Sequence, residues 1–184
     1  DLQLENGEAY HAGQIDSSYK ISDNVLTAII ICKEDHLQDI LNGVDLSGVD
    51  TIKVVTENDK ELDGTDYEYF VSARIPNLDL YLSNVGKNWG VQFSTALNND
   101  EEWLKYIKLP KGIESIDQKA FQHNYQLERI DLPNTLKTIG SEAFCHNLSL
   151  KDLLLPASVD RIENSAFYEA KITNLILTDY NSNI

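Results

Sequence analysis

A fixed spacing of two dipeptides is the feature of this sequence that most limits how it can fold. Leu-Pro and Ala-Phe each recur every 23 residues through three copies. The copies are Leu109-Pro110, Leu132-Pro133 and Leu155-Pro156, and Ala120-Phe121, Ala143-Phe144 and Ala166-Phe167. A unit of this length cannot bury its own apolar face, so such units are stable only when they stack on one another. The spacing therefore predicts a solenoid of similar coils.

Each unit also carries the L-x-x-L-x-L spacing of leucine-rich repeats. The sets begin at Leu26, Val49, Asn77, Leu104, Leu127, Leu150 and Ile172, of which Asn77 alone is polar. Residues two apart on a strand point to the same side, so the last two apolar positions of each set face a core. We therefore expect an α/β leucine-rich-repeat solenoid of about seven coils. A parallel sheet forms one face, and short helical or irregular turns form the other.

The most regular coil shows how each position is used. Pro133 lacks an N–H and ends the strand, and Leu136 then brings the chain over the core. Ala143 and Phe144 lie on the returning arm, which we expect to be one short helical turn. Phe144 fills the space between coils, and Ala143 permits their close approach.

The repeat divides the chain into three segments. Residues 104–184 hold the regular 23-residue repeats, and residues 26–103 hold irregular leucine-rich repeats. Residues 1–25 do not fit the repeat, and we interpret them as an N-terminal cap or, alternatively, a linker. No polar capping repeat follows the last strand, although an open strand edge invites pairing. We therefore expect either a segment of a longer protein or a dimer that covers this edge.

The unit I-x-L-P-x-x-[ILV]-x-x-I-x-x-x-A-F resembles the BspA-like leucine-rich repeats, which occur in surface proteins of host-associated anaerobic bacteria and of some protists. The match is close from Leu104 to Leu177, loose from Leu26 to Leu82, and absent before Leu26. The resemblance implies a right-handed solenoid, extracellular or cell-surface display, and adhesion or protein binding. It implies no catalytic residues, so none is carried over.

Charge argues against two classes of partner. The formal net charge is −15, and residues 1–110 hold 20 Asp and Glu against 8 Lys and Arg. Residues 111–184 hold 10 against 7, so the acidity lies mainly in the first part. Phosphate backbones and anionic lipids repel such a chain, so we expect no nucleic-acid partner. No apolar run approaches the ~20 residues of a membrane span, so we expect no membrane insertion in this segment.

The two cysteines, Cys32 and Cys145, are predicted to be unlinked. They lie about five coils apart, which places them roughly 24 Å from each other at the usual strand spacing. A disulfide tolerates a Cα separation of only about 7 Å.

Candidate ligand-binding residues lie on the outward face of the predicted sheet. They are Tyr81, Tyr106, Lys108, Arg129, Asp131 and Leu154. Tyr81 and Tyr106 are expected close together on strands about 4.8 Å apart, with Arg129 nearby. Exposed aromatic residues beside an arginine are typical of a binding hot spot. The alternative is a set of cross-strand pairs that only stabilise the sheet, each by ~0.2–1 kcal/mol.

The same alternation places Ala28 and Ile30 on the outward face, where Ile30 would share a row with Tyr81. Ile176 would lie beside Leu154 and extend an apolar patch at the C-terminal edge.

Metal sites and catalytic sites are not predicted. Asp59, Glu61, Asp63 and Gly64 match part of a calcium-loop spacing, but Phe70 stands where a bidentate Glu is required. We interpret this stretch as an acidic surface loop that precedes a possible helix at 67–75. His123 and His146 should stack on adjacent coils, but no third ligand recurs with them. Catalytic motifs are missing from the sequence, and we expect no cofactor.

These observations favour a non-catalytic, surface-displayed or secreted binding module whose partner is a host or neighbouring-cell protein. Two alternatives stay open. A glycan-binding module would stack sugar rings on Tyr81, Tyr106, Trp89 and Trp103. A passive spacer in a longer surface protein would bind nothing.

Overall fold

The computed structural model describes residues 17–58, 60, 62–81 and 103–178. It also describes the backbone of three two-residue strands: β1 (Leu2–Gln3), β2 (Ala9–Tyr10) and β7 (Asn88–Trp89). β1 and β2 pair antiparallel, and β7 pairs parallel to β9 (Ser115–Ile116).

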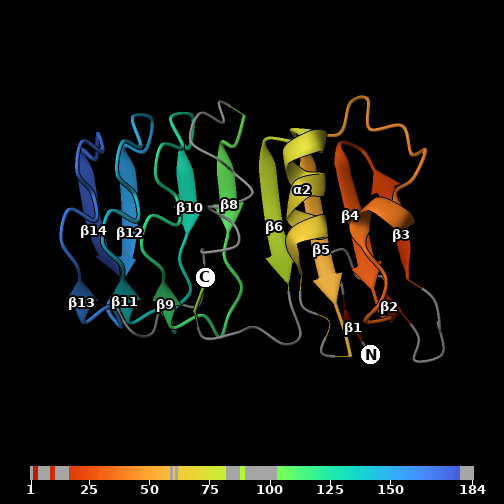
Figure 1. Ribbon diagram of the computed structural model, residues 1–184, viewed down its shortest axis with the longest axis horizontal. Coiled ribbons are helices and arrows are strands. Elements are labelled where there is room, and N and C mark those ends of the chain that lie inside the picture. The colour runs from red at the N-terminus through yellow and green to blue at the C-terminus, as the bar shows by residue number, and fades with distance from the viewer. Residues whose placement is uncertain are drawn as a thin grey trace.

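Seven strands of one face follow each other along the long axis of the molecule (Figure 1). They are β4 (Val25–Ile30), β5 (Thr51–Thr56), β6 (Asn77–Tyr81), β8 (Tyr106–Lys108), β10 (Arg129–Asp131), β12 (Asp152–Pro156) and β14 (Asn174–Thr178). The first five pair parallel in one sheet, and β12 pairs parallel with β14. One strand lies in or beside each predicted set, so the expected parallel-sheet solenoid is confirmed.

The number of turns is lower than expected, at about five rather than about seven. Seven successive strands enclose only six turns. The turn between β6 and β8 runs through residues 82–102, which lie almost entirely outside the described residues. At the N-terminal end, β3 (Ser18–Ser22) joins the sheet antiparallel to β4. The division of the chain into 1–25, 26–103 and 104–184 stays a prediction.

The opposite side of the solenoid differs between its two halves. The N-terminal coils carry α1 (Leu37–Ile40) and α2 (Gly64–Ala73), and α2 lies in front of β5 in Figure 1. The C-terminal coils carry β9, β11 (Thr138–Ile139) and β13 (Arg161–Ile162), which pair parallel in a second sheet.

The returning arm of the regular coil is a series of turns, so the helical turn expected at Ala143 and Phe144 is wrong. The N–H of Ala143 donates to the carbonyl of Gly140 at 3.2 Å, a three-residue span. The N–H of Phe144 instead donates to Ala166 of the next coil at 2.7 Å. Because equal spacing aligns the arms, alternate N–H groups bond between coils and cannot form a helix.

Phenylalanines at the repeat spacing stack through the core as predicted. The rings of Phe121 and Phe144 lie 5.3 Å apart and those of Phe144 and Phe167 lie 5.4 Å apart, all nearly parallel. Phe144 and Ala143 are fully buried. The placement of Phe144 between coils is therefore confirmed.

Asparagines at the repeat spacing complete the backbone bonding of the arms. Asn147 Nδ2 donates to the carbonyl of Phe121 at 2.7 Å, and Asn124 Nδ2 donates to that of Gln122 at 3.5 Å. Both asparagines are buried. No disulfide joins Cys32 and Cys145, as expected.

The outward placement of Ala28 and Ile30 is wrong, because both are buried in the main core with Leu26. Ile29 instead packs with Val55 in a separate cluster on the other face. Residues 28–31 are all apolar, and such a run fits either alternation, so sequence periodicity could not choose between them.

Candidate binding face

Two rows of side chains run across the strands on the outer face of the main sheet. The central row is Thr27, Lys53, Asp79, Lys108, Asp131, Leu154 and Ile176. The flanking row is Val25, Thr51, Asn77, Tyr106, Arg129, Asp152 and Asn174. Strand register aligns both rows, and the 23-residue repeat continues them from β10 to β12.

Three predicted residues meet where the two rows cross β8 and β10, and we call Tyr106, Arg129 and Asp131 the tyrosine–arginine cluster. The Tyr106 hydroxyl donates to Asp131 Oδ2 at 2.9 Å. Arg129 donates to both Asp131 oxygens, through Nε at 2.8 Å and Nη2 at 3.0 Å. Its guanidinium carbon lies 5.3 Å from the centre of the Tyr106 ring. One carboxylate therefore orients both an aromatic ring and an arginine.

The electrostatics of the cluster favour the neutral phenol and the charged guanidinium. Burial raises the pKa of Tyr106 above its usual range, and the hydrogen bond to Asp131 raises it further. The hydrogen bond to Asp131 raises the pKa of Arg129. Arg129 stays largely exposed while Tyr106 is half-buried, so both offer surface to a partner.

The expected approach of Tyr81 to Tyr106 is wrong. Tyr106 aligns with Asn77, whereas Tyr81 lies four residues further along β6 and is paired with Val55. Four residues of strand span about 13 Å at the usual rise. Tyr81 is outward and exposed, as predicted. The error arose because the spacing is longer around β6, so the 23-residue period did not set its register.

The corrected register shows what the sequence reasoning missed in the central row. Asp79 occupies the position assigned to Tyr81, and Thr27 occupies that assigned to Ile30. Charges of opposite sign then alternate across four strands at Lys53, Asp79, Lys108 and Asp131. Opposite charges on neighbouring strands stabilise a sheet. Lys108, a predicted site residue, thus lies between two carboxylates.

Leu154 lies beside Ile176 at the C-terminal end of the central row, and both are exposed. The apolar pair predicted at the C-terminal edge of the outward face is therefore confirmed. Trp103, in contrast, is buried in the core, so it is not available to stack on a sugar. The side chain of Trp89 lies outside the described residues.

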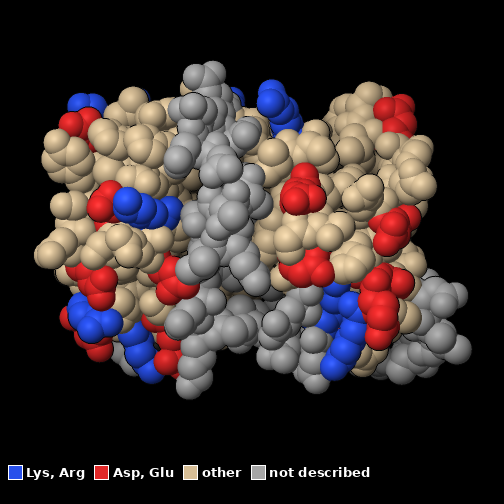
Figure 2. Space-filling view, in the orientation of Figure 1, with Lys and Arg blue, Asp and Glu red and all other residues tan. Residues whose placement is uncertain are grey.

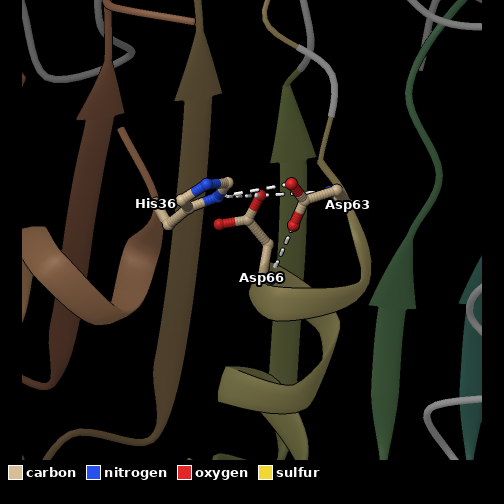
Figure 3. Close-up of side chains that lie close together, drawn as sticks. All are labelled: His36, Asp63 and Asp66. Atoms are coloured by element: carbon tan, nitrogen blue, oxygen red, sulfur yellow. Dashed lines mark hydrogen bonds and ion pairs between the residues drawn. The ribbon is translucent and has the colours of Figure 1, made fainter. Parts of the chain in front are cut away.

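A buried polar network in the N-terminal half was not foreseen (Figure 3). Asp66 on α2 is fully buried and accepts backbone N–H bonds from Leu37 at 2.9 Å and Asp63 at 3.1 Å. Lys60 is only 2% exposed, and its Nζ lies 3.4 Å from Asp66 Oδ2 and from His36 Nδ1. The single recognisable signal was the spacing of Asp63 and Asp66, which form a capping box at the start of α2.

His36, Asp63 and Asp66 bring three potential metal ligands within 4.8 Å of one another. The Lys60 ammonium already lies against two of them, so a divalent cation there would face a buried like charge at short range. We therefore assign a structural role, in which the network joins α1 to α2. The calcium-loop residues Asp59 and Glu61 lie outside the described residues.

His123 and His146 stack on adjacent coils as predicted, with ring centres 4.7 Å apart. His123 Nδ1 lies 2.8 Å from the Tyr125 hydroxyl, and His146 Nδ1 lies 3.0 Å from Glu169 Oε2. Among the described residues, no group of three potential ligands includes either histidine. No helix within the described part of the chain is long and apolar enough to cross a membrane.

Residues 95–184 match the family model of the BspA type leucine rich repeat region, in six copies. This half of the chain is a BspA-type leucine-rich repeat region. The resemblance inferred from the Leu-Pro and Ala-Phe spacing is therefore confirmed. No curated protein matches the sequence.

Several solved structures are similar to this one. A T. pallidum leucine-rich repeat protein has TM-score 0.53 and 19% identity over 90% of this chain and 71% of its own. The pneumococcal vaccine antigen PcpA has TM-score 0.46 and 23% identity, over 90% of this chain and 32% of its own. A leucine-rich repeat protein from Eubacterium ventriosum has TM-score 0.46 and 22% identity, over 74% of this chain and 33% of its own. The chain thus spans about a third of the latter two proteins, and the first likeness shows the fold alone.

Proposed function

We propose that this chain is a non-catalytic binding module that binds a protein partner through the outer face of its main sheet. The observation that carries this proposal is the tyrosine–arginine cluster. Asp131 holds the Tyr106 hydroxyl and two guanidinium nitrogens of Arg129, Nε and Nη2, in one arrangement before any partner arrives. Preorganised side chains lose less conformational entropy on binding, which raises affinity.

The charge pattern favours a protein over a charged polymer. The central row alternates Lys53, Asp79, Lys108 and Asp131, and the face near the cluster has no strong net charge despite the −15 of the whole chain. A polyanion or a polycation gains little from such a face, whereas a mixed polar and aromatic protein surface complements it.

Display outside the cell fits the repeat type. Residues 95–184 are BspA-type repeats, and the resemblance to this repeat type implies display at the cell surface. We therefore place the chain at the cell surface or in the extracellular space, where its partner is a host or neighbouring-cell protein. Glycan binding is less favoured, because Trp103 is buried and Tyr81 lies far from Tyr106 along the strands.

Binding of the purified chain to a panel of extracellular matrix proteins and glycans tests the proposal. The variant Tyr106→Ala/Arg129→Ala removes the cluster, and Tyr168→Ala, an exposed tyrosine on the arm of the last coil, is the matched control. We expect a protein ligand whose affinity falls at least tenfold in the cluster variant and is unchanged in the control. Binding that survives the cluster variant would move the site elsewhere. Binding only to glycans, or to nothing, would favour the glycan or spacer alternative.

A further inference from the structure

The contact between Lys60 and Asp66 holds an amine against a carboxyl group inside the protein. Figure 2 shows acidic groups at the surface over the N-terminal strands, whereas Asp66 is 0% and Lys60 only 2% exposed. Lys60 Nζ lies 3.4 Å from Asp66 Oδ2. A well-formed hydrogen bond between an ammonium and a carboxylate is about 2.7–2.9 Å long. The contact is therefore longer than that of a well-formed ion pair, although both groups are buried.

Backbone donors hold the Asp66 carboxyl group in place. Its Oδ1 accepts the N–H of Leu37 at 2.9 Å, and its Oδ2 accepts the N–H of Asp63 at 3.1 Å. Leu37 begins α1 and Asp63 caps α2, so the fold fixes both donors. Donors of this kind stabilise the negative charge that develops on a carboxyl oxygen when a nucleophile adds to its carbon. The site therefore supports attack on the carboxyl carbon of Asp66.

His36 lies beside both the amine and the carboxyl group. Its Nδ1 is 3.4 Å from Lys60 Nζ and 3.7 Å from Asp66 Oδ2. Figure 3 shows the His36 ring facing the carboxyl groups of Asp63 and Asp66, and Nδ1 lies 3.4 Å from Asp63 Oδ2. One ring nitrogen can therefore accept a proton from the amine and deliver it to the carboxyl oxygen.

Burial favours a neutral product from this pair. An ammonium and a carboxylate lose their hydration when they are buried, and their mutual attraction offsets that cost only where the geometry is good. An amide carries no charge, and its oxygen can keep the hydrogen bond from Leu37. Exclusion of water also protects a bond from hydrolysis. A surface ion pair such as Lys137 with Glu114 has neither property, because both of its side chains are partly exposed.

We propose that Lys60 and Asp66 form an intramolecular isopeptide bond, in a reaction of the chain with itself. After Nζ loses a proton to His36, it attacks the carboxyl carbon of Asp66, and the bond from that carbon to Oδ2 breaks. Oδ2 leaves as water with two of the three ammonium protons, and the third stays as the amide N–H. No oxidant or co-reactant is needed. The bond joins the segment after β5 to α2, and it does not depend on the proposed binding face.

Intact mass spectrometry of the purified full chain tests the bond. We expect the unmodified chain to be lighter by one water than its sequence requires, and Lys60→Met to have its full sequence mass. Lys137→Met, which removes the lysine of the surface pair, is the matched control and should still lack one water. None of these masses depends on the stability of the variant Lys60→Met.

Digestion with trypsin tests the position of the bond. Trypsin should leave the chain uncut after Lys60 and release residues 54–74 as one peptide, whose fragmentation places the link between Lys60 and Asp66. In His36→Ala, the linked fraction should fall by about tenfold or more, with an unchanged circular dichroism spectrum, because the proton carrier is lost. A full sequence mass for the unmodified chain, a water loss that persists in Lys60→Met, or an undiminished linked fraction in His36→Ala would each overturn the proposal.

Discussion

The two halves of the solenoid align their parallel strands along one face but close their coils differently. From β8 onward, the coils keep a nearly constant spacing, and their arms are turns that hydrogen-bond to the next arm, as Phe144 bonds to Ala166. Before β8, the coils are longer, and α1 and α2 take the place of the arms. A helix satisfies its own backbone, so those coils gain no ladder between arms. They are joined instead by Asp66, which accepts the N–H of Leu37.

The comparison shows what equal spacing contributes to a repeat protein. Identical coils place each N–H opposite an acceptor on the next coil and each phenylalanine on another phenylalanine. Where the spacing between coils varies, adjacent coils are joined instead by a specific buried polar network. We therefore expect the N-terminal half to depend on a few buried polar groups, and the C-terminal half on repeated apolar stacking.

The largest loss of stability is expected for Asp66→Ala. This change leaves the Lys60 ammonium buried without its carboxylate and removes the acceptor of the Leu37 N–H. Breaking a buried ion pair by removing one partner costs about 3–5 kcal/mol. Urea unfolding would measure it, with Asp63→Ala as the control, because this half-exposed cap should cost only about 0.5–2 kcal/mol. Equal losses in the two variants would show that Lys60 does not depend on Asp66.

In the regular half, Phe144→Ala should cost about 3–5 kcal/mol in unfolding free energy, because a fully buried ring is removed from a stack of three. Phe167→Ala, at the partly exposed end of that stack, should cost less. The same urea titration compares them. A Phe144 variant as stable as the parent chain would contradict the stacking account.

The sequence predicted the regular half better than the irregular half, for a physical reason. Three copies at one spacing fix which residues share a row, so Arg129 and Asp131 were placed correctly. Around β6 the spacing changes, and the register of Tyr81 was misassigned. In β4, the continuous apolar run does not show which residues face the core. Ile30 was therefore predicted on the outward face, although it is buried in the main core.

The polar network escaped prediction because its members come from different coils. Periodicity does not show that Lys60, Asp66 and His36 meet in space. On the binding face, the sequence supplied all three residues of the tyrosine–arginine cluster, but not the hydrogen bonds by which Asp131 holds Tyr106 and Arg129 together.

A smaller effect is expected for the asparagine ladder. Asn147→Ala removes the buried hydrogen bond from its side chain to the carbonyl of Phe121, and the loss of one such bond costs about 0.5–1.5 kcal/mol. Asn124→Ala, whose donated bond is longer at 3.5 Å, should cost less. Thermal unfolding of the two variants would rank them, and the reverse order would contradict the assignment of the Phe121 bond.

The smallest predicted effect is a gain in stability. Ser165 adopts a positive φ of 56° in the arm of the last coil, where glycine is not strained. Ser165→Gly should stabilise the chain by about 0.5–1 kcal/mol, because relief of the left-handed strain exceeds the extra chain entropy. A matched Lys171→Gly change, at a residue without positive φ, should not stabilise it. A raised melting temperature for Ser165→Gly alone is the expected result.

The measurement that tests the central claim most directly is an alanine scan along the central row against the protein partner found in the panel. Calorimetry would give the affinity of variants at Lys53, Asp79, Lys108, Asp131 and Leu154. We predict that the loss of affinity peaks at Lys108 and Asp131, beside Tyr106 and Arg129, and declines towards both ends of the row. Uniform affinities across the row, or a peak at Lys53 over the N-terminal coils, would contradict a binding face centred on the tyrosine–arginine cluster.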